Sequence, residues 1–399
     1  MDGRRALLAI GARRALLATD GGRAFLARTA PPSPPRTTGG HVPTGRRPED
    51  RSPHRRTMPG TRPVRRRPPA ALAMSSEAAA AVLSPDVLDA LDAVCALGPH
   101  PVVHDFAGPA ARAALADAEV LVTGWGCPPL DAGVLAAAPA LRAVVHTAGS
   151  VRGHVTDACW ERGIEVSSAA AANALPVAEY TVAMILLSGK RVLERARDLR
   201  ASRAPDDWLA TPPDVGNYGR TVGILSASLI GRRVIELLRP YDLRVLLHDP
   251  YVSDAEAAAL GVRPVTLDTL FAESDVVSVH TPLLPATTGL VSGELLARMR
   301  PDAVLVNTAR GAVVDQDALV GALRRGRIRA VLDVTDPDPL PPAHPLWNCD
   351  NVLITPHLAG SQGNELRRLA DLAVEEVARW AAGDGFAHPV QRERLAFLA

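Results

Sequence analysis

The chain has 399 residues, enough for two or three domains, and 47% of them are hydrophobic, which is ample for sizeable cores. It contains no unbroken run of about 18 apolar residues, so we expect no segment that spans a membrane. The net charge of +1 conceals an asymmetry: residues 1–74 hold 16 Arg, no Lys and 4 acidic residues, a charge of +12, and the remainder carries −11. An acidic folded part argues against nucleic acid as a partner.

Residues 1–74 are predicted to form a disordered extension, because Pro, Arg and Gly dominate them and hydrophobic periodicity ends near residue 28. Three interpretations are open. The segment is a targeting peptide, a basic arm for anionic surfaces, or sequence upstream of a true translation start at Met58 or Met74. We favour the last, because globular-looking sequence begins directly after Met74.

The cysteine pattern indicates a reducing compartment. No CxxC pair and no paired spacing occurs, so we expect free thiols, no metal site and a cytoplasmic protein. The four residues concerned are Cys95, Cys127, Cys159 and Cys349.

Between residues 75 and 172, short apolar strands alternate with helical segments, which predicts a parallel sheet covered by helices. Ligands bind outside the carboxyl ends of such strands. Two expected strands end in small residues, one beside Trp125 and one at Gly149 and Ser150. The N–H groups of Gly149 and Ser150 are therefore candidates to hold a carboxylate, although from these residues alone two ordinary glycine turns are the preferred interpretation. We expect strands at 101–104, 119–123, 141–146 and 165–167.

Residues 221–249 predict strand, tight turn, helix and strand, the first half of a dinucleotide-binding fold. The fingerprint G-x-G-x-x-G falls on Ser226, Ser228 and Gly231, so only its third glycine is present, and an ordinary βαβ turn is the alternative. The helix N-terminus should face a pyrophosphate. Asp249, 18 residues after Gly231, is placed to accept a ribose hydroxyl, and its charge favours NAD over NADP.

The chain from 173 to 358 is expected to form a six-strand doubly wound sheet around this unit. A long helix at 177–193 precedes it, with an apolar stretch too short to cross a bilayer, and residues 199–218 form a connecting arm. The remaining strands are expected at 275–280, 303–308, 329–334 and 351–355.

Five sequence blocks, read in order, resemble the D-isomer-specific 2-hydroxyacid dehydrogenases over about residues 80–390. They are PVAEYTVAMILL (176–187), HTPLLPATTGL (280–290), NTARGAVVDQDAL (307–319), VLDVTDPDPL (331–340) and NVLITPHLAGS (351–361).

The resemblance implies an α/β protein with two doubly wound parallel-sheet domains, and a homodimer. A flavodoxin-like substrate domain would occupy 75–172 and be completed by 359–390. A Rossmann NAD-binding domain would occupy 173–358.

The family's catalytic arginine falls on Arg310, where a guanidinium can hold a substrate carboxylate or carbonyl through two parallel hydrogen bonds. Its acid–base histidine falls on His357. Imidazole titrates near pH ~6.5, so this side chain type can give a proton to a ketone oxygen and recover it. The family's glutamate is replaced by Asp338, one methylene shorter, and Asp336 is the competing candidate. We expect Asp338 to orient the ring of His357.

The resemblance also implies the binding residues. For NAD these are Ser226, Ser228, Leu229, Ile230, Gly231, Asp249, His280, Pro282, Thr287, Thr308, Ala309, Asp333, His357 and Gly360. For the substrate they are Trp125, Gly149, Ser150 and Arg310.

The predicted function is reversible hydride transfer between NAD(H) and a 2-oxo or 2-hydroxy acid. Within this reaction class, a phosphoglycerate dehydrogenase and a glyoxylate or hydroxypyruvate reductase stay open. A formate dehydrogenase would have Gln beside the histidine, where this chain has Asp. A different class is an NAD-responsive regulatory scaffold of the same fold without turnover.

Overall fold

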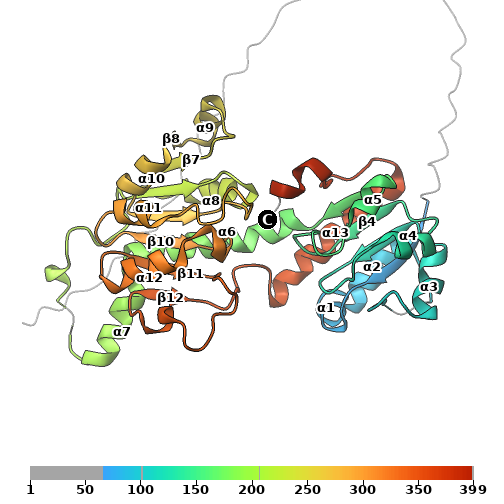
Figure 1. The fold of residues 1–399 in the computed structure, drawn as a ribbon, viewed down its shortest axis with the longest axis horizontal. Coiled ribbons are helices and arrows are strands. Elements are labelled where there is room, and N and C mark those ends of the chain that lie inside the picture. The colour runs from blue at the N-terminus through green and yellow to red at the C-terminus, as the bar shows by residue number, and fades with distance from the viewer. Residues whose placement is uncertain (1–65, 100–101, 206, 398–399) are drawn as a thin grey trace, which may run out of the picture. The chain divides into compact units, whose positions relative to one another are not determined.

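The computed structural model describes residues 66–99, 102–205 and 207–397. These residues form two parallel β-sheets with helices on both faces of each (Figure 1). Most of the predicted extension, including Met58, lies outside the described residues. The elements are β1 (Pro69–Ala73), α1 (Ser76–Val82), α2 (Pro85–Val94), β2 (Ala96–Leu97), α3 (Pro109–Ala116), β3 (Val120–Thr123), α4 (Ala132–Ala137), β4 (Ala143–His146), α5 (Asp157–Glu161), β5 (Glu165–Ser168), α6 (Ala170–Gly189), α7 (Val192–Ser202), η1 (Trp208–Ala210), β6 (Thr221–Leu225), α8 (Leu229–Leu238), β7 (Arg244–His248), α9 (Asp254–Leu260), β8 (Arg263–Pro264), α10 (Leu267–Glu273), β9 (Val276–Val279), α11 (Gly293–Arg298), β10 (Val304–Asn307), η2 (Gly311–Val313), α12 (Gln316–Arg324), β11 (Arg329–Leu332), η3 (Pro345–Asn348), β12 (Val352–Ile354), η4 (Gly363–Glu365), α13 (Leu366–Ala382) and η5 (Arg392–Phe397).

The described chain opens with a strand, β1, inside the segment predicted to be disordered, so that prediction was wrong for Pro69–Ala73. β1 pairs with β2 and β3, and every residue of β1 after Pro69 is buried. Its short apolar sequence, PAALA, directly follows an Arg- and Pro-rich stretch, whose composition concealed it. A chain that began at Met74 would lack this hydrogen-bonded strand, so Met74 is not a start compatible with the sheet.

The first sheet has the order β2-β1-β3-β4-β5 with all pairs parallel, which is the flavodoxin-like order. Successive side chains of a strand point to opposite faces. Leu121 of β3 therefore packs on the side of α3, α4 and α5, and its neighbour Val122 packs on the side of α1, α2 and α13. Of the strand expected at 101–104, the described residues 102–104 form only an isolated bridge, from Val103 to Ala73, and β2 lies earlier in the chain.

The C-terminal helix α13 returns to the first sheet and is fastened there by a buried carboxylate. Glu376 is 1% exposed. Its side chain accepts hydrogen bonds from Ser167 Oγ at 2.5 Å, Ala387 N at 2.9 Å and His388 N at 3.0 Å. The helix thereby joins β5 to the chain that follows α13.

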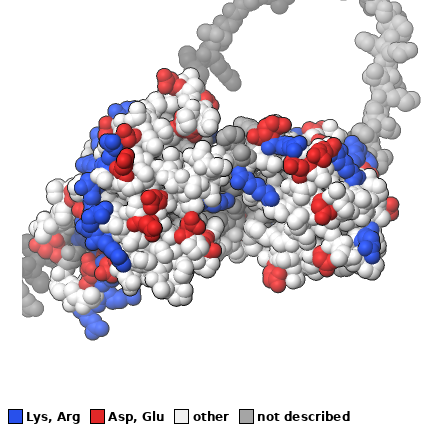
Figure 2. Space-filling model, in the orientation of Figure 1, with Lys and Arg blue, Asp and Glu red and all other residues white. Residues whose placement is uncertain are grey.

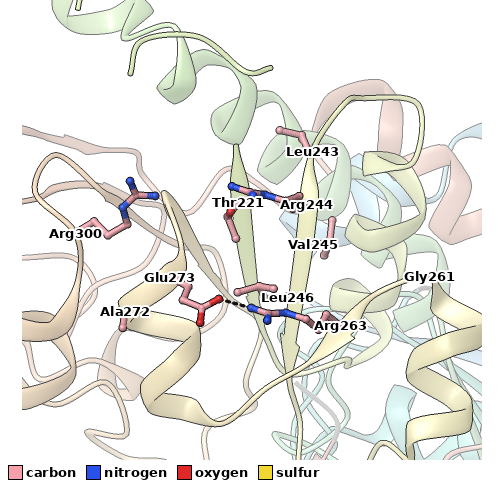
Figure 3. Close-up of a pocket in the computed structure, with 10 residues that line it drawn as sticks. All are labelled: Thr221, Leu243, Arg244, Val245, Leu246, Gly261, Arg263, Ala272, Glu273 and Arg300. Atoms are coloured by element: carbon pink, nitrogen blue, oxygen red, sulfur yellow. Dashed lines mark hydrogen bonds and ion pairs between the residues drawn. The ribbon is translucent and has the colours of Figure 1, made fainter. Parts of the chain in front are cut away.

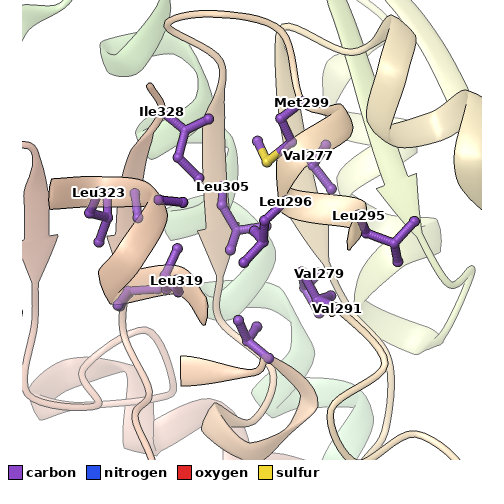
Figure 4. Packing of buried hydrophobic residues seen from close by; sticks show 14 of the residues in the cluster. Val277, Val279, Val291, Leu295, Leu296, Met299, Leu305, Leu319, Leu323 and Ile328 are labelled. Carbon is purple, nitrogen blue, oxygen red and sulfur yellow. The ribbon is translucent and has the colours of Figure 1, made fainter. Parts of the chain in front are cut away.

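The second sheet has the order β12-β11-β10-β9-β6-β7-β8, again all parallel. Numbered from β6 in chain order, the strands lie in the order 3-2-1-4-5-6-7, which is the Rossmann order with one further strand, β12, at the edge. Six of these seven strands were expected, and the short β8 was missed. Helices α6, α8 and α9 cover one face, and α10, α11 and α12 cover the other. Figure 4 shows the latter core, where Leu296 of α11 lies beside Leu305 of the sheet.

Helix α6 is longer than expected and passes through the predicted domain boundary between residues 172 and 173. By length and composition alone its 20 residues are apolar enough to cross a membrane, with 44% of the window buried. The helix is still not an unbroken apolar run, because Asn173 and Glu179 interrupt it. In the structure its residues Ala178, Val182 and Ile185 pack in the same core as α8.

Charged residues are spread over the surface. On the face seen in Figure 2, acidic and basic side chains are interspersed on both halves of the described chain.

Candidate active site

The carboxyl ends of the second sheet's strands gather most of the predicted functional residues. Because all its strands are parallel, residues that follow them lie along one edge. Ser226 follows β6, Asp249 follows β7, His280 follows β9, Arg310 follows β10 and His357 follows β12.

The turn after β6 has the conformation of a glycine turn although it begins with serine. Ser226 has φ 77°, in the left-handed region, and its Oγ lies 3.0 Å from Thr281 Oγ1. Ser228 is the N-cap of α8, and its Oγ accepts a hydrogen bond from Gly231 N at 3.3 Å. A Cβ on Gly231 would lie 2.1 Å from Ser226 O, so the third glycine is required for this close approach.

The groups at this turn fit a dinucleotide. The N–H groups of Leu229 and Ile230 open α8, where no intrahelical acceptor exists, so they are available to a pyrophosphate. Asp249 accepts hydrogen bonds from Ala227 N and Tyr251 N, each at 2.8 Å. Its carboxylate retains acceptor capacity for ribose hydroxyls. The two serines therefore change the contacts of the turn without removing its shape.

Two other predicted cofactor residues, Thr287 and Thr308, use their side-chain hydroxyls in hydrogen bonds within the protein. Thr287 Oγ1 donates to Pro282 O at 2.6 Å and closes the turn after β9. Thr308 Oγ1 lies 2.9 Å from Thr181 Oγ1 of α6, and Ala309 N donates to Asn307 Oδ1 at 3.0 Å. Any contact of this group with NAD would be made by backbone atoms or by methyl groups.

His280 is a buried residue, 3% exposed. Its Nε2 lies 2.9 Å from Ser278 Oγ, and its Nδ1 has no partner in the described part of the chain. Burial lowers the pKa of His280 to about 3, so the ring is neutral.

His357 and Asp338 are in direct contact. His357 Nδ1 and Asp338 Oδ2 are 2.8 Å apart, and the two side chains are 53% and 38% exposed. The aspartate thus reaches the ring without a bridging water, despite being shorter than glutamate. Of the two aspartates considered, Asp338 and not Asp336 makes this contact. His357 also has φ 53°, a rare conformation for a residue with a side chain, of the kind that clusters at functional sites.

Asp333 shapes the segment that carries His357. This side chain is 1% exposed. Its Oδ1 accepts from Thr355 Oγ1 at 2.6 Å and Leu358 N at 2.9 Å, and its Oδ2 accepts from Ala359 N at 2.9 Å. Tyr180 of α6 extends this network, since its hydroxyl lies 2.8 Å from Thr355 Oγ1. The predicted contact of Asp333 with a nicotinamide carboxamide stays a prediction.

Arg310 is partly buried, and its Nη1 donates to Ala309 O at 2.7 Å. Burial lowers the pKa of Arg310, and the charge of nearby Arg152 adds to this effect. Within the described chain, Arg310 makes no hydrogen bond to His357 or Asp338. A partly desolvated guanidinium without a carboxylate partner is suited to an anionic ligand.

The predicted substrate loops meet an unpredicted residue, Asn173, in the first turn of α6. A Cβ on Gly149 would lie 3.6 Å from Asn173 Nδ2, and one on Gly360 would lie 3.5 Å from Asn173 Oδ1. Asn173 Oδ1 also accepts from Ser361 N at 3.0 Å. The side chain therefore lies close to the loop after β4 and is hydrogen-bonded to the backbone that follows His357. The one sequence signal was a lone amide within the run AAAANALP.

Two further predicted substrate residues are accessible. Trp125 is 43% exposed, and its carbonyl accepts from Ser75 N at 2.8 Å. Ser150 is exposed on the loop after β4.

A cavity of about 770 Å³ lies elsewhere, at the amino ends of β6 and β7. Figure 3 shows its lining, including Thr221, Arg244 and the ion pair of Arg263 with Glu273. The predicted site residues do not line this cavity, because they follow the opposite ends of the same strands.

The two sheet orders and the glycine-like turn define a nucleotide-binding α/β protein of the Rossmann class. Residues 182–359 match the model of the D-isomer specific 2-hydroxyacid dehydrogenase NAD binding domain. The chain is 35% identical over 261 residues to glyoxylate reductase of Thermofilum pendens, across 64% of this chain and 76% of that protein. The chain therefore belongs to the D-isomer-specific 2-hydroxyacid dehydrogenase family, as its sequence blocks predicted, and its cofactor is NAD.

Two more relatives show the range of the family. D-3-phosphoglycerate dehydrogenase of Mycobacterium leprae is 34% identical over 296 residues, across 73% of this chain but only 55% of that protein. The chain thus spans about half the length of that relative. The structure of D-lactate dehydrogenase from Aquifex aeolicus, complexed with NAD and lactic acid, is 26% identical with a TM-score of 0.59, covering 79% of this chain and 96% of that one.

Proposed function

We propose that the protein is an NAD-dependent D-2-hydroxyacid dehydrogenase that interconverts a 2-oxo acid and a D-2-hydroxy acid. The observation that carries this proposal is the 2.8 Å contact between His357 Nδ1 and Asp338 Oδ2. It lies at the same sheet edge as Arg310 and Asp249. A regulatory scaffold without turnover has no need of an accessible imidazole paired with an acid.

In this proposal Arg310 binds the substrate carboxylate or the carbonyl that becomes an alkoxide. Its guanidinium supplies two parallel donors, and its partial burial strengthens the interaction. The N–H groups of Gly149 and Ser150 hold the carboxylate from the other side. NADH, when bound, supplies the hydride to C2.

His357 is the proposed acid and base. Because Nδ1 is engaged by Asp338, Nε2 is the nitrogen left to exchange a proton with the substrate oxygen. In the reducing direction Nε2 gives its proton to the ketone oxygen, and Asp338 stabilises the protonated ring before transfer. In the oxidising direction the same nitrogen recovers the proton.

Asp249 is proposed to select NAD over NADP. Its two backbone donors, Ala227 N and Tyr251 N, fix the carboxylate beyond the end of β7. A carboxylate held there accepts from the ribose hydroxyls of NAD and repels the 2′-phosphate of NADP.

The experiment that tests this function is oxidation of NADH and of NADPH with a panel of 2-oxo acids. The panel should contain glyoxylate, hydroxypyruvate, pyruvate and phosphohydroxypyruvate, because the relatives differ in their substrates. Trp125 follows β3, the neighbour of the strand that precedes Gly149 and Ser150, and we propose that it favours an apolar substituent at C3. We expect turnover with NADH. Binding of NADH without turnover on any 2-oxo acid would contradict the proposal.

The first sheet with α13 is proposed to be the substrate domain, and the second sheet the NAD-binding domain. We place the protein in the cytoplasm because its four cysteines are free and buried. Burial raises the pKa of both Cys95 and Cys127 to about 12, so neither is a reactive thiolate.

A homodimer is proposed through α7 and the arm that follows it. No residue of α7 is buried, and Leu199, Leu209 and Tyr218 are 53%, 75% and 89% exposed. Such a group of exposed apolar side chains marks an interaction surface. We expect light scattering to give twice the chain mass, and Leu199→Glu to shift the protein toward monomer. A monomeric wild type at micromolar concentration would contradict the dimer.

A further inference from the structure

The loop that carries Asp338 has little packing of its own. Its residues Asp336 to Pro339 are all exposed, between buried Thr335 and buried Leu340. We call residues 335–340 the acid loop. A carboxylate on four consecutive exposed residues keeps a fixed position only if something holds the backbone.

A single side chain holds that backbone at Asp336. Gln316 Oε1 accepts a hydrogen bond from Asp336 N at 3.0 Å, and Gln316 Nε2 donates to Asp336 O at 2.5 Å. The amide nitrogen also lies 3.2 Å from His344 Nε2, beyond the far end of the acid loop. The amide thus bonds both polar backbone groups of one residue, as a neighbouring strand would.

Gln316 lies at the start of a well-packed helix. It is the first residue of α12, directly after the N-cap Asp315, whose side chain accepts from Ala318 N at 2.9 Å. The helix is anchored by Leu319 and Leu323, which are 1% and 2% exposed (Figure 4). The side chain therefore transmits the position of a buried helix to an exposed loop.

The acid loop is also fitted against the residue that follows Arg310. A Cβ on Gly311 would lie 2.0 Å from Thr335 C and 2.6 Å from Asp336 N, so the two backbones are in close contact. Gln316 of α12 contacts the same backbone through its two hydrogen bonds to Asp336. Both fix Asp336, two residues before the carboxylate that touches His357.

We infer that Gln316 is a positioning residue, which holds the acid loop so that the short side chain of Asp338 reaches His357 Nδ1. This inference rests on the proposed function. An amide is suited to the task because it presents an acceptor and two donors on one planar group, whereas an ionised Glu is acceptor-only. A Glu at this position keeps the bond from Asp336 N and loses the bond to Asp336 O.

The test compares Gln316→Ala and Gln316→Glu with Asp317→Ala, an exposed neighbour on the same turn, in the full-length protein. With ¹⁵N-labelled histidine, NMR follows the Nδ1 proton of His357, identified by its loss in His357→Asn. We expect a protected signal in wild type and Asp317→Ala. We expect it to be weakened or exchange-broadened in both Gln316 variants.

Kinetics provide the second readout. We expect both Gln316 variants to lose kcat by about 10- to 100-fold, the order expected from misplacing a catalytic group, with NADH affinity within about twofold. In an Asp338→Asn background the Gln316 substitutions should cause no further loss, because the group they position is already gone. Gln316→Glu is nearly isosteric and guards against a variant that does not fold.

Gln316 variants with an unchanged His357 signal and unchanged kcat would overturn the inference. The same holds if their loss of kcat is as large in the Asp338→Asn background. If the wild type turns over no 2-oxo acid, the proposed function fails, and the NMR comparison still decides on Gln316 because it needs no substrate.

Discussion

At the residue scale, the nucleotide turn shows what a glycine fingerprint requires. The first position needs the left-handed conformation, which Ser226 adopts at φ 77°. The second position tolerates Ser228 because that residue caps α8. Only the third position excludes a side chain, since a Cβ on Gly231 would meet Ser226 O. Gly231 is thus the one position of the three where steric contacts require glycine, and it is the one where glycine is present.

Gly231→Ala is predicted to disturb this turn. A methyl group 2.1 Å from a backbone oxygen forces α8 away from β6, at a cost of about 1–3 kcal/mol for such overpacking. We expect a lower free energy of unfolding in urea and weaker NADH binding. Gly153→Ala is the control, because a Cβ there meets nothing within 4 Å. Equal stability of the two variants would refute this account of the turn.

The contacts of the polar site residues were only partly foreseeable. His357 and Asp338 were predicted together from sequence blocks, and the structure adds their direct contact. Asn173 and Gln316 act through partners at the ends of other strands and loops. No local sequence pattern predicts these hydrogen bonds, because they join segments that are distant in the sequence and meet only in the folded chain.

At the element scale, buried strands with β-branched residues were the most predictable part. β6 and β7 have their expected bounds, and β9 to β12 end within two residues of theirs, as is usual at element ends. β1 was not predicted, because its alanines carry little strand preference, and neither was the two-residue β8. The predicted long helix is divided in the structure: α6 ends at Gly189 and α7 begins at Val192.

The fastening of α13 gives a test at this scale. Glu376→Ala removes the acceptor for Ser167 Oγ, Ala387 N and His388 N, of which the first belongs to a buried residue. We expect the free energy of unfolding to fall by about 2–3 kcal/mol. The adjacent Glu375 is exposed, so Glu375→Ala should change it little. Indistinguishable urea unfolding curves for the two variants would show that the carboxylate does not fasten α13.

At the scale of the whole molecule, buried histidines set the response to acid. His146 and His154 lie 4.4 Å apart between ring centroids, and both share Thr123 Oγ1. Burial lowers the pKa of His146 to about 3, with a contribution from His154, and burial lowers that of His154 to about 4. Together with His280, they are neutral in the folded protein.

The sign of the pH effect follows from these lowered pKa values. In the unfolded chain these histidines take up protons below about pH 6.5, whereas in the folded chain His154 does so only near pH 4. Their contribution to the free energy of unfolding is therefore complete above pH 6.5 and is lost as the pH falls below it. Each such histidine contributes a slope of up to about 1.4 kcal/mol per pH unit. We expect His154→Gln to show a shallower fall than wild type in urea unfolding between pH 6.5 and 5. Parallel falls would contradict the role of the buried rings.

The central claim is that His357, held by Asp338, moves the proton in a reaction with a 2-oxo acid. Its most direct test is NADH oxidation by wild type, His357→Asn and Asp338→Asn, with NADH binding measured for each. The account predicts that His357→Asn loses about 10²–10⁴-fold in kcat, that Asp338→Asn loses less, and that NADH affinity is kept. Near-normal turnover by His357→Asn would contradict it.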